Sequence, residues 1–244
     1  MIRVFASNRR AAWEDVVSVV LNEFMAGYEF EAWNFDVEKY RKDALSIPQS
    51  ERALDYLIVL FYRHWGDVNA PGKRLWGDKT TPGSFEFLHK IALVFPRAKY
   101  VHIVRDGRDC VASAMKAGFF NEDAETAATA WRDNVQFCRN FGSQLHSPTD
   151  YLEVRYEELV NDPDSCIPHI CGFLNVAPHA AIFQGDSEVT TELQDVVSIS
   201  HHANVSKPVF SSSIGKWKKA FTTQELTRIN QIMASELLRF GYKD

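Results

Sequence analysis

The sequence has few cysteines, no long apolar run and no excess of basic residues, and each shortage excludes a class of protein. Four cysteines in 244 residues, none paired as C-x-x-C, form neither a disulfide framework nor a paired zinc site. The longest apolar runs, such as residues 56–62, are far shorter than the roughly 20 residues that a membrane helix needs. A formal net charge of −5 gives no general attraction to nucleic acid or to an anionic membrane.

The N-terminus, residues 1–5, also lacks the longer apolar segment of a secretory signal. We therefore expect a cytoplasmic protein in a reducing compartment, with no transmembrane segment. Hydrophobic residues make up 45% of the chain and charged residues 24%, which is ordinary globular usage and argues against disorder. The length suits a single α/β domain that covers residues 1–244.

Apolar periodicity predicts the order of the elements along the chain. Each of two expected strands leads directly into a short helix, and this alternation is typical of a parallel sheet flanked by helices. A polar loop at about 184–213 precedes the last helix, which begins at a capping sequence, residues 222–225. The strands are expected over 99–104 and 151–155. The main helices are expected over 11–26, from 48 to a stop at Gly66 and then Pro71-Gly72, and over 84–94, 121–142, 167–174 and 223–240.

The most informative stretch is residues 101–113, where a strand ends on Arg105, turns through a glycine and enters a helix. Arginine can bind a phosphate through two N–H groups, and a helix N-terminus adds free backbone N–H groups and a favourable dipole. Ser113 can contribute a hydroxyl from the same side, at the edge where open α/β sheets bind ligands. The pattern indicates an anion site. The alternative is a tight turn whose aspartates cap the helix while its arginines are solvated.

Four segments, in this order along the chain, resemble motifs of sulfotransferases that use 3′-phosphoadenosine-5′-phosphosulfate (PAPS). Residues 73–82, KRLWGDKTTP, resemble the Trp-Gly-Glu-Lys-Thr-Pro segment of bacterial members. Residues 105–113 resemble the 3′-phosphate-binding segment, and residues 152–159 resemble the strand and Tyr-Glu-Asp-Leu segment whose tyrosine contacts adenine. Residues 206–209 with 213–217 are similar to the C-terminal nucleotide loop, notably that of the tyrosylprotein-sulfotransferase-like branch.

The resemblance implies a P-loop-NTPase-like parallel sheet flanked by helices. It also implies transfer of a sulfonyl group from PAPS, as co-substrate, to an acceptor hydroxyl or amine, with no metal. Such an in-line displacement depends mostly on positioning and on cations placed where charge develops. The acceptor could be a saccharide, a lipid, a peptide or a small molecule, and nucleic acid is not an expected partner.

By the same resemblance, Arg105 and Ser113 would hold the 3′-phosphate, and Tyr156 would pair with adenine. The segment around Lys216 would close over the bisphosphate. The alternatives are a buried tyrosine at the end of a strand for Tyr156, and a solvated lysine beside a core tryptophan for Lys216. The implied nucleotide-binding residues are Arg105, Ser113, Tyr156, Ser212, Ser213, Gly215 and Lys216.

Two residues of the 73–82 segment would act in catalysis. The resemblance implies that Lys79 faces the bridging or sulfonyl oxygens and that Asp78 acts as the base that removes the acceptor's proton. The alternative for Asp78 is a turn residue, since it follows a glycine.

One motif of the family is missing from the sequence. Residues 1–30 contain a single glycine, Gly27, so Ala6–Arg10 cannot form the loop that cradles a 5′-phosphosulfate. We expect the N-terminal strand and loop to be absent, because translation starts upstream of Met1 or because the chain is a truncated relative. The rivals are a degenerate relative that binds only the adenosine 3′-phosphate half, and a phosphotransferase that uses Mg²⁺ and ATP. The lack of a Gly-Lys-Ser/Thr loop argues against the second rival.

Overall fold

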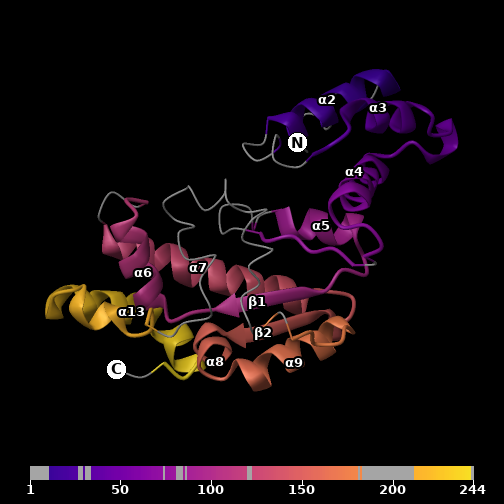
Figure 1. Cartoon of the computed structure of the whole chain (residues 1–244). Helices are drawn as coiled ribbons and strands as arrows, with labels where there is room; N and C mark the ends of the chain where they lie inside the picture. The colour runs from indigo at the N-terminus through magenta and orange to yellow at the C-terminus, as the bar shows by residue number, and fades with distance from the viewer. Residues whose placement is uncertain are drawn as a thin grey trace. The chain divides into compact units, whose positions relative to one another are not determined.

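The computed structural model describes residues 11–26, 30, 34–73, 75–80, 85, 87–119, 123–180, 182 and 212–242 (Figure 1). The chain divides into two compact units, residues 1–79 and 80–244. The single domain expected over 1–244 stays a prediction. The expected absence of an N-terminal strand and loop, and most of the polar loop at 184–213, lie outside the described residues. In the described part, no helix combines the length and the apolar character needed to cross a membrane.

The first unit is helical and has its own core. Its elements are α2 (Trp13–Met25), α3 (Val37–Leu45), the 3-10 turn η2 (Gln49–Glu51) and α4 (Leu54–Asn69). Along each helix, apolar residues recur every three or four positions and form one apolar face. The apolar faces of the three helices pack together in a shared core. The largest fully buried members of this core are Val17, Val20, Leu21, Tyr40 and Leu57.

The sequence prediction for α4 was wrong at its start. The helix was expected to begin near Pro48, but it begins at Leu54; it ends at Asn69, between the two expected stops, Gly66 and Pro71-Gly72. Residues 49–51 form a separate 3-10 turn, and the backbone is extended at the next residues, up to the N-cap. The Arg52 side chain holds this break because its Nε donates to the Ile47 carbonyl oxygen at 3.1 Å.

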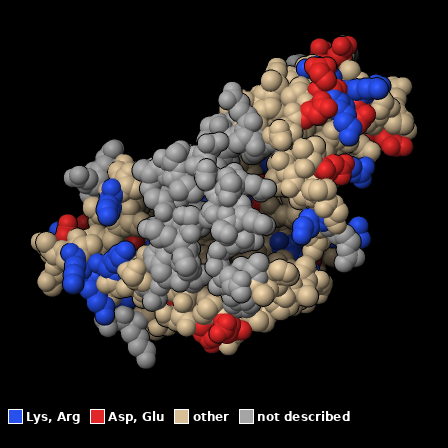
Figure 2. Space-filling model, in the orientation of Figure 1, with Lys and Arg blue, Asp and Glu red and all other residues tan. Residues whose placement is uncertain are grey.

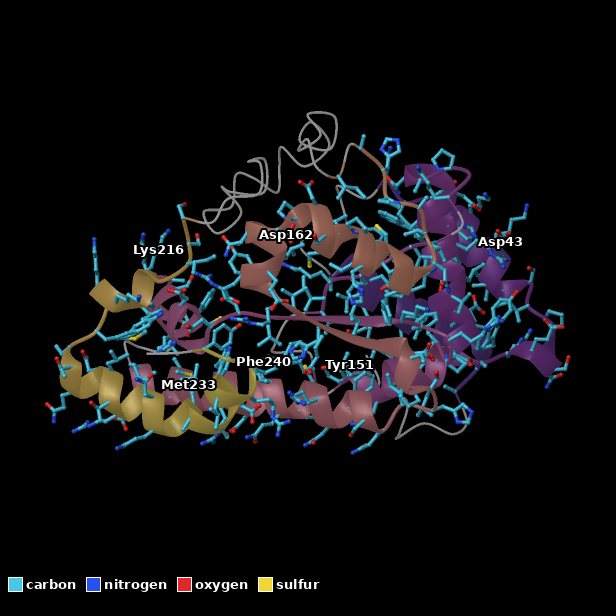
Figure 3. All side chains as sticks on the ribbon, turned by 90° about the horizontal axis from the view of Figure 1, so that it is seen from below. Asp43, Tyr151, Asp162, Lys216, Met233 and Phe240 are labelled. Atoms are coloured by element: carbon cyan, nitrogen blue, oxygen red, sulfur yellow. The ribbon has the colours of Figure 1, made fainter. Side chains whose placement is uncertain are left out.

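The second unit has a parallel pair of strands between two layers of helices. In Figures 1 and 3, α6, α7 and α13 lie on one side of the strands, and α8 and α9 lie on the other. The predicted parallel sheet with flanking helices is therefore confirmed. In chain order the elements are α5 (Leu88–Val94), β1 (Tyr100–Val104), α6 (Gly107–Lys116), α7 (Ala124–Ser143), η4 (Pro148–Asp150), β2 (Tyr151–Arg155), α8 (Tyr156–Asn161), α9 (Pro163–Leu174), η5 (Lys216–Lys219) and α13 (Thr223–Arg239).

The register of the two strands fixes where their carboxyl ends lie. Tyr100 pairs with Tyr151 and Val104 pairs with Arg155, so both strands end at the same edge. Tyr151 lies between β2 and α7 (Figure 3), where a Cβ atom on Gly142 would lie 2.6 Å from its ring. This close approach of α7 holds the strands against the helix layer.

The helices α6, α7 and α13 pack closely because small residues line their contact. Their shared core includes Val111 of α6, Ala127 and Ala128 of α7, and Met233 of α13. At Gly107 a Cβ atom would lie 2.6 Å from the Met233 sulfur and 2.7 Å from the Trp131 ring. The first turn of α6 is thus fixed against α7 and α13, and this turn carries the residues that follow β1.

Candidate functional site

The carboxyl ends of β1 and β2 bring two helix starts to one edge of the sheet. After β1 the chain turns at Asp106, whose side chain caps α6 by accepting from the Arg108 backbone N–H at 2.9 Å. After β2 the chain enters α8 directly at Tyr156. Ligands of open α/β sheets bind at such an edge.

Arg108 is a structural residue in this turn. Its side chain is only 1% exposed, and its Nε and Nη2 donate to the two carboxylate oxygens of Asp106 at 3.0 and 2.8 Å. The guanidinium also lies 4.0 Å from the centre of the Trp217 ring. A buried charge needs such pairing. The alternative in which both arginines are solvated is therefore wrong for Arg108.

At this edge, Arg105 contacts residues of two other predicted nucleotide-binding segments, Tyr156 and Ser213. Its Nη2 donates to the Ser213 carbonyl oxygen at 2.5 Å, and its guanidinium lies 5.1 Å from the centre of the Tyr156 ring. Its Nε is buried and has no hydrogen-bond partner among the described residues. The structure thus brings together Arg105, Tyr156 and Ser213, three residues implied by the family resemblance.

Asp109 joins α6 to residues 212–217, which we call the nucleotide segment. Its side chain is fully buried, and its two oxygens accept from the Gly215 N–H at 2.7 Å and the Trp217 N–H at 3.0 Å. Its Oδ2 also lies 4.0 Å from the Arg105 guanidinium. The sequence suggested only a helix cap for this aspartate, so its role was missed. No local pattern signals a bond to backbone groups more than 100 residues away.

Glu157 supports the same edge from the start of α8. One carboxylate oxygen accepts from the Asp106 backbone N–H at 2.9 Å, and the other accepts from the Tyr242 hydroxyl at 2.8 Å. Burial, together with the hydrogen bond and the charge of Glu157, raises the pKa of Tyr242, so this hydroxyl stays a donor. Both residues were missed, because nothing in the sequence links them to residue 106.

Three of the remaining nucleotide-binding candidates are exposed to solvent. Ser113 is exposed in the second turn of α6, and Ser212 and Lys216 are exposed on the nucleotide segment. Lys218 and Lys219 of η5 are exposed as well. On the face shown in Figure 2, basic side chains gather where α6 and α13 lie. Positive charge at this end of the unit suits a phosphorylated ligand.

Asp78 and Lys79 belong to the first unit, and both are exposed. The Tyr62 hydroxyl donates to Asp78 Oδ2 at 2.9 Å, and the Tyr62 ring stacks on Trp76 with centroids 3.9 Å apart. Burial and the Asp78 charge raise the pKa of Tyr62. Asp78 is therefore held against α4, and the predicted catalytic roles of Asp78 and Lys79 stay predictions.

Other features of the described chain carry no part of this site. Among the described residues, no group of three or more His, Cys, Asp or Glu side chains is placed to hold a metal ion. The metal-free reaction stays a prediction. A cavity of about 340 Å³ lies at the opposite end of β1, where Tyr100, Phe141 and Leu145 line it, and it includes none of the predicted site residues.

Comparisons with known proteins agree on one family. The profile described as "Sulfotransferase family" matches residues 5–179. Protein-tyrosine sulfotransferase 1 of Danio rerio is 26% identical over 217 residues, which cover 84% of this chain and 58% of that protein. Protein-tyrosine sulfotransferase A of Caenorhabditis elegans is 25% identical over 158 residues, which cover 61% of this chain and 40% of that protein. The chain thus spans only about half the length of these relatives.

Two solved sulfotransferase domains share the fold. The domain from the Synechococcus PCC 7002 olefin synthase gives a TM-score of 0.63 at 21% identity, covering 93% of this chain and 81% of the domain. The domain from the curacin biosynthetic pathway gives 0.55 at 20% identity, covering 88% and 78%. The expected P-loop-like α/β fold is confirmed. Because the family profile matches well over half of its residues, the chain belongs to the sulfotransferase family.

Proposed function

We propose that this chain is a PAPS-dependent sulfotransferase whose second unit binds the adenosine 3′-phosphate end of the donor. The observation that supports this most directly is the meeting of Arg105, Tyr156 and Ser213 at the carboxyl ends of β1 and β2. These residues come from three separate segments, each of which resembles a nucleotide-binding motif.

Arg105 suits a phosphate for two physical reasons. Its guanidinium has a buried Nε–H without a hydrogen-bond partner among the described residues, and a buried donor of this kind is costly unless an acceptor reaches it. Its Nη2 bonds a neutral carbonyl oxygen, and a phosphate oxygen forms a stronger, charge-assisted bond. A 3′-phosphate would therefore compete well for this side chain, and the Ser113 hydroxyl would be a second ligand from α6, the helix that follows Arg105.

In the proposed reaction, the acceptor oxygen or nitrogen attacks sulfur. The bond between sulfur and the bridging phosphate oxygen breaks, and adenosine 3′,5′-bisphosphate leaves with that electron pair. Lys79 would stabilise the negative charge that develops on the leaving oxygen, and Asp78 would take the proton of the acceptor. The Tyr62 hydroxyl, which donates to Asp78 Oδ2 at 2.9 Å, fixes the orientation of this carboxylate.

A second candidate is a relative that binds the nucleotide and transfers nothing. The observation that favours it is the composition of residues 1–30, where Gly27 is the single glycine and no loop suited to a 5′-phosphosulfate can be recognised. This candidate predicts that PAPS and adenosine 3′,5′-bisphosphate bind with equal affinity.

The test is calorimetric titration of the full chain with PAPS, adenosine 3′,5′-bisphosphate and adenosine 5′-monophosphate. We expect Arg105→Ala to weaken binding of the bisphosphate by about tenfold to a hundredfold, the value of a hydrogen-bonded charge. It should leave the weak binding of the monophosphate unchanged, because that ligand lacks the 3′-phosphate. The matched control is Arg132→Ala, which removes an arginine that pairs with the neighbouring Asp133 on α7.

Three outcomes separate the candidates. Undiminished binding of the bisphosphate to Arg105→Ala would refute the 3′-phosphate site. Tighter binding of PAPS than of the bisphosphate, with sulfonyl transfer to any acceptor in a mixed panel of saccharides, phenols and tyrosine peptides, would support the enzyme. Equal binding of the two nucleotides without transfer would support the binding protein.

A further inference from the structure

We propose that Asp109 is a positioning residue that holds the nucleotide segment, residues 212–217, at the 3′-phosphate site. The inference rests on the proposed function, because it gives Asp109 a role in binding the same nucleotide. It concerns a residue that touches no expected ligand atom and acts through Gly215 and Trp217.

The carboxylate of Asp109 binds the segment at two points. Oδ2 accepts from the Gly215 N–H at 2.7 Å, and Oδ1 accepts from the Trp217 N–H at 3.0 Å. Gly215 has a φ of +74°, the left-handed conformation that glycine adopts without steric cost. At this residue the chain turns so that two N–H groups, on either side of Lys216, reach the same carboxylate.

The burial of Asp109 makes these two bonds strong constraints. A carboxylate that is 0% exposed is stable only where hydrogen bonds and opposite charge replace water. Gly215 and Trp217 supply the hydrogen bonds, and the Arg105 guanidinium, 4.0 Å away, supplies the charge. If the segment left, the carboxylate would lose both N–H donors. The segment is therefore held by the cost of leaving a buried charge without hydrogen bonds.

The contacts form a closed ring that includes the phosphate-binding arginine. Arg105 donates to the Ser213 carbonyl oxygen at 2.5 Å, the segment runs from Ser213 to Gly215, Gly215 donates to Asp109, and Asp109 faces Arg105. The Trp217 indole adds a further anchor because it stacks on Arg108 at 4.0 Å. Asp109 thus couples the position of Lys216 to the position of Arg105.

The coupling predicts a specific dependence between two residues. Lys216 lies between the two backbone groups that Asp109 holds, so its contribution to nucleotide binding should require Asp109. Lys219 lies on the same turn, η5, but outside the held stretch, and it serves as the control.

The experiment is a double-mutant cycle on binding of adenosine 3′,5′-bisphosphate, measured by calorimetry. Asp109→Asn keeps the shape of the side chain but turns an amide N–H₂ toward one of the two backbone N–H donors. We expect Asp109→Asn and Lys216→Ala each to weaken binding about tenfold, and the double variant to bind no more weakly than Asp109→Asn alone. Lys219→Ala should add its own small effect in either background. Independent, multiplicative effects of Asp109→Asn and Lys216→Ala would overturn the proposal.

A second measurement needs no nucleotide. Hydrogen exchange of the ligand-free chain should be faster at residues 212–219 in Asp109→Asn, while exchange in β1 and α7 stays as in the parent. Asp133→Asn is the matched control, because Asp133 is 58% exposed on α7. If Asp109→Asn unfolds the whole unit, Gly215→Ala replaces it. This variant strains the left-handed residue and disturbs the segment while the carboxylate stays in place.

The two measurements separate failure of this proposal from failure of the proposed function. If the parent binds the bisphosphate and Asp109→Asn binds it equally well, the role of Asp109 is refuted and the function stands. If the parent binds no nucleotide, the function fails, and the exchange data alone decide whether Asp109 holds the segment. Unchanged exchange at 212–219 would then refute the proposal.

Discussion

Gly107, the first residue of α6, has no room for a side chain. A Cβ atom there would lie 2.6 Å from the Met233 sulfur and 2.7 Å from the Trp131 ring. We expect Gly107→Ala to lower the free energy of unfolding by about 1–3 kcal/mol, because overpacking moves α6 away from α7 and α13. Urea denaturation followed by far-UV circular dichroism measures this change.

The control for this prediction is the same substitution in α9. At Gly172 a Cβ atom would meet nothing within 4 Å, so alanine only restricts the unfolded chain and favours the helix. Gly172→Ala should leave stability unchanged or raise it by up to about 1 kcal/mol. Equal losses in both variants would show that packing at Gly107 is not the cause.

At the scale of the element, α13 depends on its first turn. The Thr222 hydroxyl accepts from the Glu225 N–H, and the Glu225 carboxylate accepts from the Thr222 N–H at 2.8 Å. In this capping box, each side chain is the hydrogen-bond acceptor for the other residue's backbone N–H. We expect Thr222→Ala to lower the free energy of unfolding by about 1 kcal/mol, because the Glu225 N–H loses its acceptor. Chemical denaturation provides the value.

Thr227→Ala on the same helix separates capping from helix propensity. Thr227 is exposed in the interior of α13, and its hydroxyl bonds the Thr223 carbonyl oxygen of the preceding turn. Alanine is the better helix former there, so this variant should be neutral or slightly stabilising. A loss as large as that of Thr222→Ala would contradict the capping explanation.

Elements with a strong local signal were predicted well from the sequence. The strand predicted over 151–155 is β2 at the same residues, and the capping sequence correctly predicts where α13 begins. Weaker signals misplaced helix starts: α5 begins at Leu88 instead of near Ser84, and α4 begins after the break that Arg52 holds. Such starts depend on single side-chain contacts, which periodicity does not encode.

The site was predictable only in part. Arg105 was singled out by the strand–turn–helix pattern as well as by a family motif, and Tyr156 and Ser213 by family motifs alone; the structure brings the three together. Asp109 and Glu157 were missed because their partners lie far away in sequence. The roles of the site residues, and the cytoplasmic location, stay predictions.

At the scale of the whole molecule, the second unit should lose stability at alkaline pH. Burial raises the pKa of the Cys110 thiol to about 12 and that of the Cys138 thiol to about 11. In the unfolded chain, a cysteine thiol has a pKa of about 9. Because the folded pKa values are the higher ones, the contribution to stability is complete below about pH 9 and declines as the pH rises further. The unfolded chain then loses thiol protons that the folded chain keeps.

The expected slope is at most about 1.4 kcal/mol per pH unit for each thiol. Urea denaturation under reducing conditions, from about pH 8 to about pH 10, measures it. The double variant Cys110→Ala, Cys138→Ala should show a smaller decline over this interval, whatever its stability at neutral pH. The same decline in the variant and the parent would show that other groups, such as the buried tyrosines, cause it.

The bonds that join Arg105 and Asp109 to residues 213–217 also determine when this cluster can form. Arg105 and Asp109 bind backbone groups 106 to 108 residues further along the chain, whereas β1 and β2 pair over a much shorter stretch. Closing a longer loop costs more chain entropy, and contacts of high sequence separation form slowly. The strands and the helices between them can therefore assemble first. During synthesis Arg105 can therefore be in place at the end of β1 before residues 212–217, which it contacts in the folded chain, have been made.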